Sequence, residues 1–188
     1  IIKTNIMKVG DSPAPSCTPT VQSSCCGTGV YRFQLGSIDN LTGDSLVGYE
    51  DFSCKIYTTI YTGSKQQLTV QTGSIYNENL KVWLDYNNDG SFSDSTELLF
   101  SHNGLKNHSK EILIPIVSDT NKFLRMRVAS DYDGLNPPLA CGPLIYGQVE
   151  DYGVRINRSY FKPNADMIYS ITDPCNKIVS FSDYSEFH

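Results

Sequence analysis

The chain has 188 residues and a formal net charge of −5, which is long enough for one well-cored domain or for one domain and part of a second. The acidic balance and the lack of a basic run argue against a nucleic-acid partner, and no apolar run approaches the roughly 20 residues that span a bilayer. With 12 Tyr, 8 Phe, 14 Gly and 9 Pro, the composition favours short strands joined by turns, so we expect an all-β fold.

The first segment, residues 1–20, contains Pro13, Pro15 and Pro19 without periodicity, which predicts a linker or an extended arm. The chain opens IIKTNIMKVG, with neither an initiator Met nor a signal-peptide pattern, so we expect a processed or excised segment. Beyond the arm, alternating apolar residues and β-branched or aromatic runs predict strands at residues 31–35, 56–61 and 68–71.

An oxygen-rich loop follows the next predicted strand, in the stretch LKVWLDYNNDGSFSDSTELL at residues 80–99. Its spacing D-x-N-x-D-G puts oxygen ligands at alternate positions and then a glycine for a sharp backbone reversal, which is typical of a calcium loop. We therefore predict one bound Ca²⁺. The expected ligands are Asp85, Asn87, Asp89, the backbone carbonyl of Ser91, and a later carboxylate from Asp94 or Glu97.

This loop departs from a helix–loop–helix calcium site in two ways. The position of the bidentate Glu holds Thr96, with Glu97 one residue late. Upstream, Leu80, Val82 and Leu84 alternate with polar or outward residues, a period of two that predicts a strand and not an entering helix. The loop is expected to join two strands. A plain hairpin turn is the alternative, because turns also favour Asn, Asp, Gly and Ser.

Further strands are predicted at residues 97–101, 112–116 and 123–128. In the last of these, period two places Leu124, Met126 and Val128 towards the core, with Arg125 and Arg127 facing outward.

The segment SDYDGLNPPLACGPLIY, residues 130–146, is predicted to be a long loop. It is either a binding loop that uses Asp131, Tyr132 and Asp133 or a surface excursion pinned by Cys141. Trp83 is likewise either a stacking platform for a sugar or a packing residue beside the metal loop.

The predicted strand at residues 148–156 carries a carboxylate on its apolar face. Period two places Glu150 with Tyr152, Val154 and Ile156, while Asp151 takes the solvent-facing direction. A buried carboxylate needs a metal, an arginine or backbone N–H groups as a partner. We expect a satisfied structural role for Glu150; the alternative is a solvated residue at an exposed turn.

The six cysteines match no zinc framework, because they form no pair of C-x-x-C knuckles and the three histidines are scattered. Disulfides formed in an oxidising compartment explain them better than free cytosolic thiols. Adjacent cysteines are expected to have different partners, because a bridge between neighbours is strained. The cysteines expected to pin loops to the sandwich are Cys17, Cys25, Cys26, Cys54 and Cys141, with Cys175 available as the sixth.

Several separated motifs resemble the bacterial GEVED domain, whose name-giving motif stands here as GQVEDY at residues 147–152. The motif's second Glu and its Asp-Tyr are retained as Glu150, Asp151 and Tyr152, while Gln148 replaces the first Glu. Matching elements occur in order at residues 17–20 (CTPT), 27–40 (GTGVYRFQLGSIDN), 48–52 (GYEDF), 82–92 (VWLDYNNDGSF), 123–128 (FLRMRV) and 140–142 (ACG). The resemblance covers about residues 17–156. It implies a secreted or surface-attached accessory module, with conjectured glycan or surface-polymer ligands.

The tail resembles the opening of a polycystic-kidney-disease (PKD) type immunoglobulin-like domain, through PNAD at residues 163–166 and VSFSDYS at residues 179–185. A domain of that class needs about 80 to 100 residues to close its sheets, so this piece would leave apolar faces and open edges. We expect either a longer natural chain or strand addition between copies, with residues 1–9 as a plausible donor.

We therefore predict a jelly-roll-like antiparallel β-sandwich at residues 17–160, an arm or linker at residues 1–16 and a partial immunoglobulin-like segment at residues 161–188. No zinc helix, nucleophile elbow or phosphate loop is present, and the adjacent pairs Glu50–Asp51 and Glu150–Asp151 point to opposite strand faces, which suits acid–base catalysis poorly. We expect a non-catalytic, extracellular building block whose partners are neighbouring domains or copies. The alternative is a carbohydrate- or polymer-binding accessory module of a secreted enzyme.

Overall fold

The computed structural model describes residues 14–23, 26–43, 46–116 and 122–159, and the backbone of residues 167–173 and 178–183. Two compact units are distinguished, Ile1–Arg158 and Ser159–His188. The expected donor segment at residues 1–9 lies outside the described residues, and so do Cys25 and Cys175.

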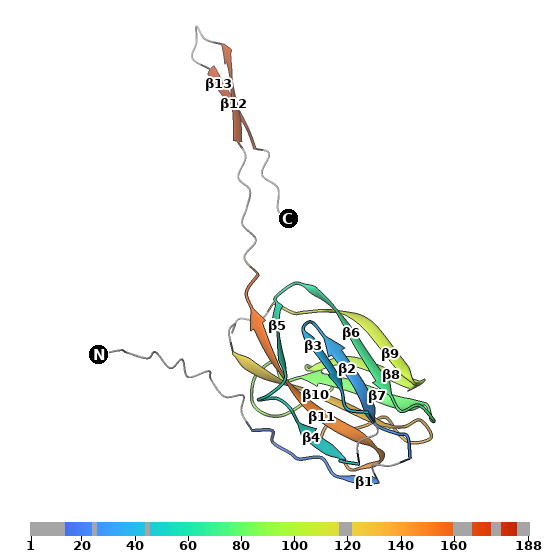
Figure 1. Cartoon of the computed structure of the whole chain (residues 1–188). Coiled ribbons are helices and arrows are strands. Elements are labelled where there is room, and N and C mark those ends of the chain that lie inside the picture. The colour runs from blue at the N-terminus through green and yellow to red at the C-terminus, as the bar shows by residue number, and fades with distance from the viewer. Residues whose placement is uncertain are drawn as a thin grey trace, which may run out of the picture. The chain divides into compact units, whose positions relative to one another are not determined.

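The described part of the chain is built from strands and contains no helix (Figure 1), so no helix there is long and apolar enough to cross a membrane. The strands of the first unit are β1 (Val21–Ser23), β2 (Val30–Leu35), β3 (Ile38–Leu41), β4 (Tyr49–Asp51), β5 (Tyr57–Tyr61), β6 (Lys65–Thr72), β7 (Glu78–Leu84), β8 (Leu98–Leu105), β9 (Asn107–Leu113), β10 (Phe123–Tyr132) and β11 (Leu144–Asn157).

Two sheets form the predicted all-β sandwich. The larger sheet has the order β1-β11-β10-β7-β8, with β4 and β5 also paired to β11, and the smaller sheet has the order β3-β2-β6-β9. Most pairs are antiparallel, but β11 pairs in parallel with β1, β4 and β5. These parallel pairs join distant segments, which period-two patterns cannot reveal.

The core lies between the sheets and follows the alternation in the sequence. Leu68 and Val70 of β6 are buried with Phe33 of β2, and Leu124 and Met126 of β10 face the same cluster. Burial of a large apolar side chain contributes roughly 1.5–3 kcal/mol, so these alternating positions fix the register of each strand.

The predicted strand at residues 112–116 is displaced in the structure. Strand β9 is Asn107–Leu113, with His108 and Ile112 buried and the residues between them exposed. The prediction placed the strand too far towards the C-terminus because it followed the continuous apolar run after Ile112. A strand with one solvent-exposed face needs apolar residues only at alternate positions.

Arg125, Arg127 and Asp151 point away from the core between the sheets, as their positions in the strands predict, but the solvent exposure expected of Asp151 on this face is wrong. All three lie on the outer face of the larger sheet, yet their exposed fractions are 4%, 0% and 0%. A second apolar cluster covers that face, formed by Trp83, Ala129, Ala140, Leu144 and Val149 with Val21, Tyr49, Phe92 and Leu98 packed against it. The covering segments come from distant parts of the chain, so both faces of β10 and β11 are dry.

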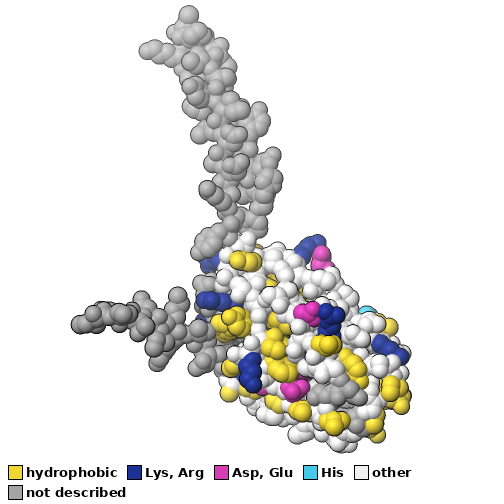
Figure 2. All heavy atoms as spheres, viewed as in Figure 1, with side chains coloured by type: hydrophobic (Ala, Val, Ile, Leu, Met, Phe, Trp, Pro, Cys, Tyr) yellow, Lys and Arg dark blue, Asp and Glu magenta, His cyan; other side chains and the backbone are white. Residues whose placement is uncertain are grey.

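The described surface shows no strong separation of charge on the face drawn in Figure 2, where Lys and Arg side chains lie close to Asp and Glu side chains among uncharged ones. Exposed ion pairs among the described residues include Arg32–Asp39, at 2.6 Å, and Lys65–Glu111, at 2.9 Å.

The second unit contains a two-stranded antiparallel sheet of β12 (Met167–Asp173) and β13 (Ile178–Asp183). Its register pairs Met167 with Asp183 and Ile171 with Val179. Both strands lie within residues 161–188, which were predicted to be a partial immunoglobulin-like segment, and the likeness to a PKD-type domain stays a prediction.

Candidate functional site

The oxygen-rich loop joins β7 to β8, as the strand pattern on its N-terminal side predicts. Asn88 and Gly90 adopt positive φ angles of 59° and 83°, which supplies the sharp reversal expected of Asn and Gly. Asp85 stands at the start of the loop and is fully buried. Its N–H donates to the carbonyl of Arg125 over 2.9 Å, which extends the pairing of β7 with β10 by one residue.

Inside the loop, the carboxylates accept hydrogen bonds from the backbone of the same loop. Asp85 accepts the N–H of Asp89 at 3.1 Å and that of Gly90 at 2.9 Å, one on each oxygen. Asn87 accepts the N–H of Asp89 at 2.9 Å, and Asp89 accepts the N–H of Ser91 at 2.7 Å. These turns point the side-chain oxygens of Asp85, Asn87 and Asp89 towards the inside of one loop.

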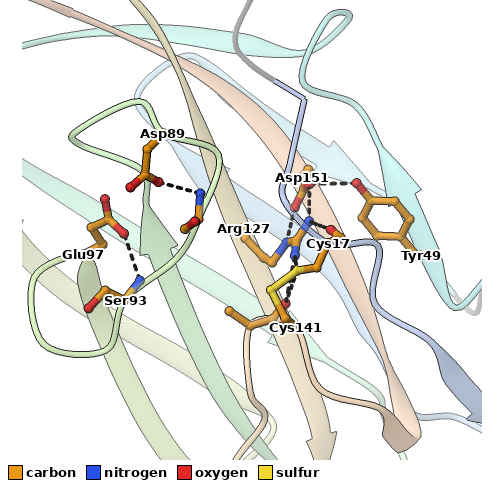
Figure 3. Close-up of a disulfide and its surroundings, with 10 residues drawn as sticks. Cys17, Tyr49, Asp89, Ser93, Glu97, Arg127, Cys141 and Asp151 are labelled. Atoms are coloured by element: carbon orange, nitrogen blue, oxygen red, sulfur yellow. Dashed lines mark hydrogen bonds and ion pairs between the residues drawn. A yellow bond between two sulfur atoms is a disulfide. The ribbon is translucent and has the colours of Figure 1, made fainter.

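Glu97 closes the loop from the far end and is 2% exposed. Its Oε2 accepts the N–H of Ser93 at 2.8 Å, but its Oε1 is buried without a hydrogen-bond partner among the described residues (Figure 3). Burial raises the pKa of Glu97, and the charges of Asp85 and Asp89 raise it further. Burial likewise raises the pKa of Asp85, with a contribution from Asp89. Three carboxylates therefore repel one another at a site where one buried oxygen is unsatisfied.

Asp94, one of the two expected late ligands, is directed elsewhere. Its Oδ1 accepts the indole N–H of Trp83 at 2.7 Å, and its Oδ2 accepts the ammonium of Lys81 at the same distance. Asp94 therefore orients Trp83, and of the two carboxylates only Glu97 lies with Asp85 and Asp89. Trp83 is itself 0% exposed, so its ring is a packing element, and the sugar-stacking role is wrong.

Among the described residues, no group of three or more His, Cys, Asp or Glu side chains is spaced as metal ligands are. Binding of a cation would therefore require Asp85, Asp89 and Glu97 to draw together. With a cation bound, such a movement would give the Oε1 of Glu97 a partner and would reduce the repulsion between the carboxylates.

The segment before β1 lies against the loop. The N–H of Ser16 donates to the carbonyl of Gly90 over 2.7 Å, and a Cβ at Gly90 would stand 2.6 Å from the carbonyl oxygen of Ala14. Glycine is therefore required here both for its φ angle and for this close approach. The disulfide between Cys17 and Cys141 then ties the same segment to the connection between β10 and β11.

A buried arginine sits beside the disulfide (Figure 3). Arg127 donates two hydrogen bonds of 2.8 Å to the two oxygens of Asp151 and a third, also of 2.8 Å, to the carbonyl of Ala140. Its guanidinium lies 4.4 Å from the ring centroid of Phe92, and the hydroxyl of Tyr49 donates to Asp151 over 2.8 Å. This network connects the GQVEDY motif to the oxygen-rich loop, through Phe92, and to the N-terminal segment, a connection that the sequence pattern did not predict.

The cysteines agree only in part with the predicted framework. Cys17 and Cys141 are bridged, and Cys26 is also disulfide-bonded. Cys54 is a free, exposed thiol, so its expected bridge does not form. It lies in the turn between β4 and β5, whose residues are already held by other bonds: the N–H groups of Lys55 and Ile56 both donate to the carbonyl of Phe52, each over 2.8 Å.

Glu150 faces the core, as its position in the strand predicts, and is 0% exposed. Its partner is the hydroxyl of Tyr152, which donates to Oε2 over 2.6 Å, while Oε1 has no partner among the described residues. Burial raises the pKa of Glu150 to about 7, and Glu50, its register partner on β4, raises it further. Gln148 of the motif donates to Glu50 over 3.3 Å and accepts the N–H of Val30 at 3.1 Å.

The expected binding loop is split between two strands and their connection. Strand β10 extends to Tyr132 and β11 begins at Leu144. Asp131 is buried and accepts three backbone N–H groups, so its carboxylate is a structural clamp and not an exposed ligand group. Tyr132 is half-buried and Asp133 is exposed.

The part of the chain that is similar to a known family supplies four strands of the larger sheet, β7, β8, β10 and β11, and strand β9 of the smaller sheet. Residues 79–155, from β7 to β11, match the model of the GEVED domain, which is less than half of the chain and includes both the oxygen-rich loop and the GQVEDY motif. The search of curated proteins and the search of solved structures returned no match. The finding supports the predicted resemblance over this range.

Proposed function

We propose that this chain is a non-catalytic, extracellular β-sandwich module stabilised by one calcium ion, and that it serves as a structural building block in adhesion or assembly. The observation that carries the proposal is the buried, unpartnered Oε1 of Glu97 beside Asp85 and Asp89. Together with Asn87 and the carbonyl of Ser91 these residues supply only oxygen donors, as a hard cation prefers. A bound ion would neutralise charge and close the loop.

The setting of the loop supports a stabilising role. The loop contacts the N-terminal segment through Ser16 and Gly90, and that segment is bridged to the connection before β11. Ordering the loop would therefore order the cover of the outer sheet face. The bridge between Cys17 and Cys141 also supports an oxidising, extracellular compartment, and the GEVED match supports a module of a secreted or surface bacterial protein.

Thermal unfolding in chelator and in calcium tests this proposal. At a calcium concentration a hundredfold above Kd, binding only to the folded state adds about 2.7 kcal/mol, which for a chain of this size raises Tm by about 5–10 °C. Magnesium is expected to shift Tm less, because it demands a stricter octahedral geometry.

Two matched variants sharpen the test. Glu97→Gln is expected to be at least as stable as the parent in chelator, because it removes a repelled, buried charge, and to lose most of the calcium shift. Asp94→Asn is the control, because Asp94 bonds to Trp83 and Lys81 and should leave the shift intact. An unchanged Tm in the parent, or equal calcium shifts in parent and Glu97→Gln, would contradict the proposal.

A further inference from the structure

A cavity of about 280 Å³ is lined by Cys26, Thr28, Tyr76, Tyr132 and Tyr146. These residues come from four segments: the turn before β2, the connection from β6 to β7, the end of β10 and the start of β11. None of them belongs to the oxygen-rich loop, so the cavity is a separate feature of the first unit. Three of its five lining residues are tyrosines, which makes the lining largely apolar.

The aromatic rings form a corner. The rings of Tyr76 and Tyr132 stand almost perpendicular, at 80°, with their centroids 5.6 Å apart, and Tyr146 provides a third ring on the lining. Tyr76 and Tyr146 are 45% and 46% exposed, so an incoming group would still remove much ring surface from water. Perpendicular ring faces with negative π clouds suit a compact tetrahedral cation better than they suit a flat ring, which stacks on one face.

A buried glutamate holds two of the four segments. Glu78 accepts the N–H of Gly29 with both oxygens, at 3.0 and 3.1 Å, and the N–H of Gly73 at 3.0 Å. Gly29 follows Thr28 directly, and Gly73 begins the connection that carries Tyr76. Glu78 is 0% exposed, so this clamp fixes one side of the cavity from behind.

A buried aspartate holds the other two segments. Asp131 accepts the N–H of Tyr132 at 2.9 Å and that of Tyr146 at 2.8 Å, and it also accepts the N–H of Ile145 at 3.0 Å. Two carboxylates thus stand behind the walls, and none of the five lining residues is Lys or Arg. The backbone that carries the rings is held before a ligand arrives, which lowers the entropic cost of binding. Burial raises the pKa of Glu78 to about 7, so the negative charge behind the rings comes mainly from Asp131.

We propose that this tyrosine pocket binds a quaternary ammonium group, such as the trimethylammonium head of choline. Methyl groups on a delocalised positive charge pack against ring faces without hydrogen bonds, and the carboxylate of Asp131 attracts the charge from behind. The lining also carries the hydroxyls of three tyrosines and of Thr28, so a sugar is the competing ligand that the test must separate from a cation.

Calorimetric titration of the full chain with choline, and with its neutral isostere 3,3-dimethylbutan-1-ol, tests the proposal. We expect choline to bind at least about tenfold more tightly than the isostere, because only the cation gains the interaction with the rings and with the carboxylate of Asp131. Phosphatidylcholine vesicles, added in a second series, distinguish a lipid headgroup from a free solute as the source of the group. Methyl glucoside is the competing ligand class.

Variants then locate the binding. Tyr76→Ala and Tyr146→Ala are each expected to weaken choline binding at least about tenfold while remaining folded, because both side chains are nearly half exposed. Tyr61→Ala is the matched control, because Tyr61 is 50% exposed and pairs with Asn157 at the opposite end of β11. The proposal is overturned if choline does not bind, if the isostere or methyl glucoside binds as well as choline, or if Tyr61→Ala weakens binding as much as the pocket variants do.

Discussion

Replacing Arg127 with Met tests whether the network under the N-terminal segment holds the sandwich together. Arg127 and Asp151 are both 0% exposed and joined by two hydrogen bonds of 2.8 Å. Breaking a buried pair of this kind costs about 3–5 kcal/mol. Asp151 would keep Arg125, at 3.1 Å, and the hydroxyl of Tyr49, so we expect the lower end, about 3 kcal/mol. For a chain of this size that lowers Tm by about 6–12 °C.

The chain offers a matched control for this substitution. Arg32 and Asp39 form a similar two-bonded pair, with bonds of 2.7 and 2.6 Å, but their side chains are 42% and 51% exposed. Arg32→Met should therefore change the free energy of unfolding little, because solvent screens the exposed pair. Urea unfolding of both variants, with Asp151→Asn and the double variant Arg127→Met/Asp151→Asn, measures the coupling. The reasoning is refuted if Arg127→Met costs no more than Arg32→Met.

Three further outcomes follow from single residues. Burial lowers the pKa of His108 to about 4 from its usual 6.5. As pH falls, the unfolded state therefore binds a proton at His108 before the folded state does, and the free energy of unfolding should fall by about 3 kcal/mol between pH 6.5 and 4. His108→Phe should lack this part of the pH dependence in chemical unfolding, and an unchanged dependence would contradict the prediction. Gly147→Ala should unfold or severely weaken the chain, because the added Cβ would stand 2.0 Å from the carbonyl oxygen of Ser130, and a circular dichroism melt like the parent's would contradict this. Cys54 is free and exposed, so in unreduced native protein an alkylating reagent should label Cys54 and leave Cys17 and Cys141 unmodified by mass spectrometry.

Strands with one wet face and one dry face were predictable from the sequence, because alternation alone defines them. The burial of Leu68 and Val70 and of Leu124 and Met126 is of this kind. The position of the oxygen-rich loop between two strands was predictable for the same reason, and so was the inward direction of Glu150.

Burial of the outer face was not predictable by this reasoning. Arg127, Asp151 and Trp83 alternate as outward residues should, but the N-terminal segment and the connection before β11 return to cover them. That cover depends on contacts between residues more than a hundred positions apart, such as the bridge from Cys17 to Cys141. Asp94 was misassigned for a related reason. Its sequence distance from Asp89 suits a metal ligand, but the indole N–H of the buried Trp83 needs an acceptor, and the carboxylate of Asp94 is that acceptor.

Direct calorimetric titration of calcium into chelator-treated protein tests the central claim most directly. We predict one site per chain in the parent and in Asp94→Asn, and no measurable site in Asp89→Ala. The charge of Asp89 acts on Glu97 within the loop, whereas Asp94 is bonded to Trp83 and Lys81. Absence of binding heat in the parent, together with no calcium found by elemental analysis of the dialysed protein, would contradict the account.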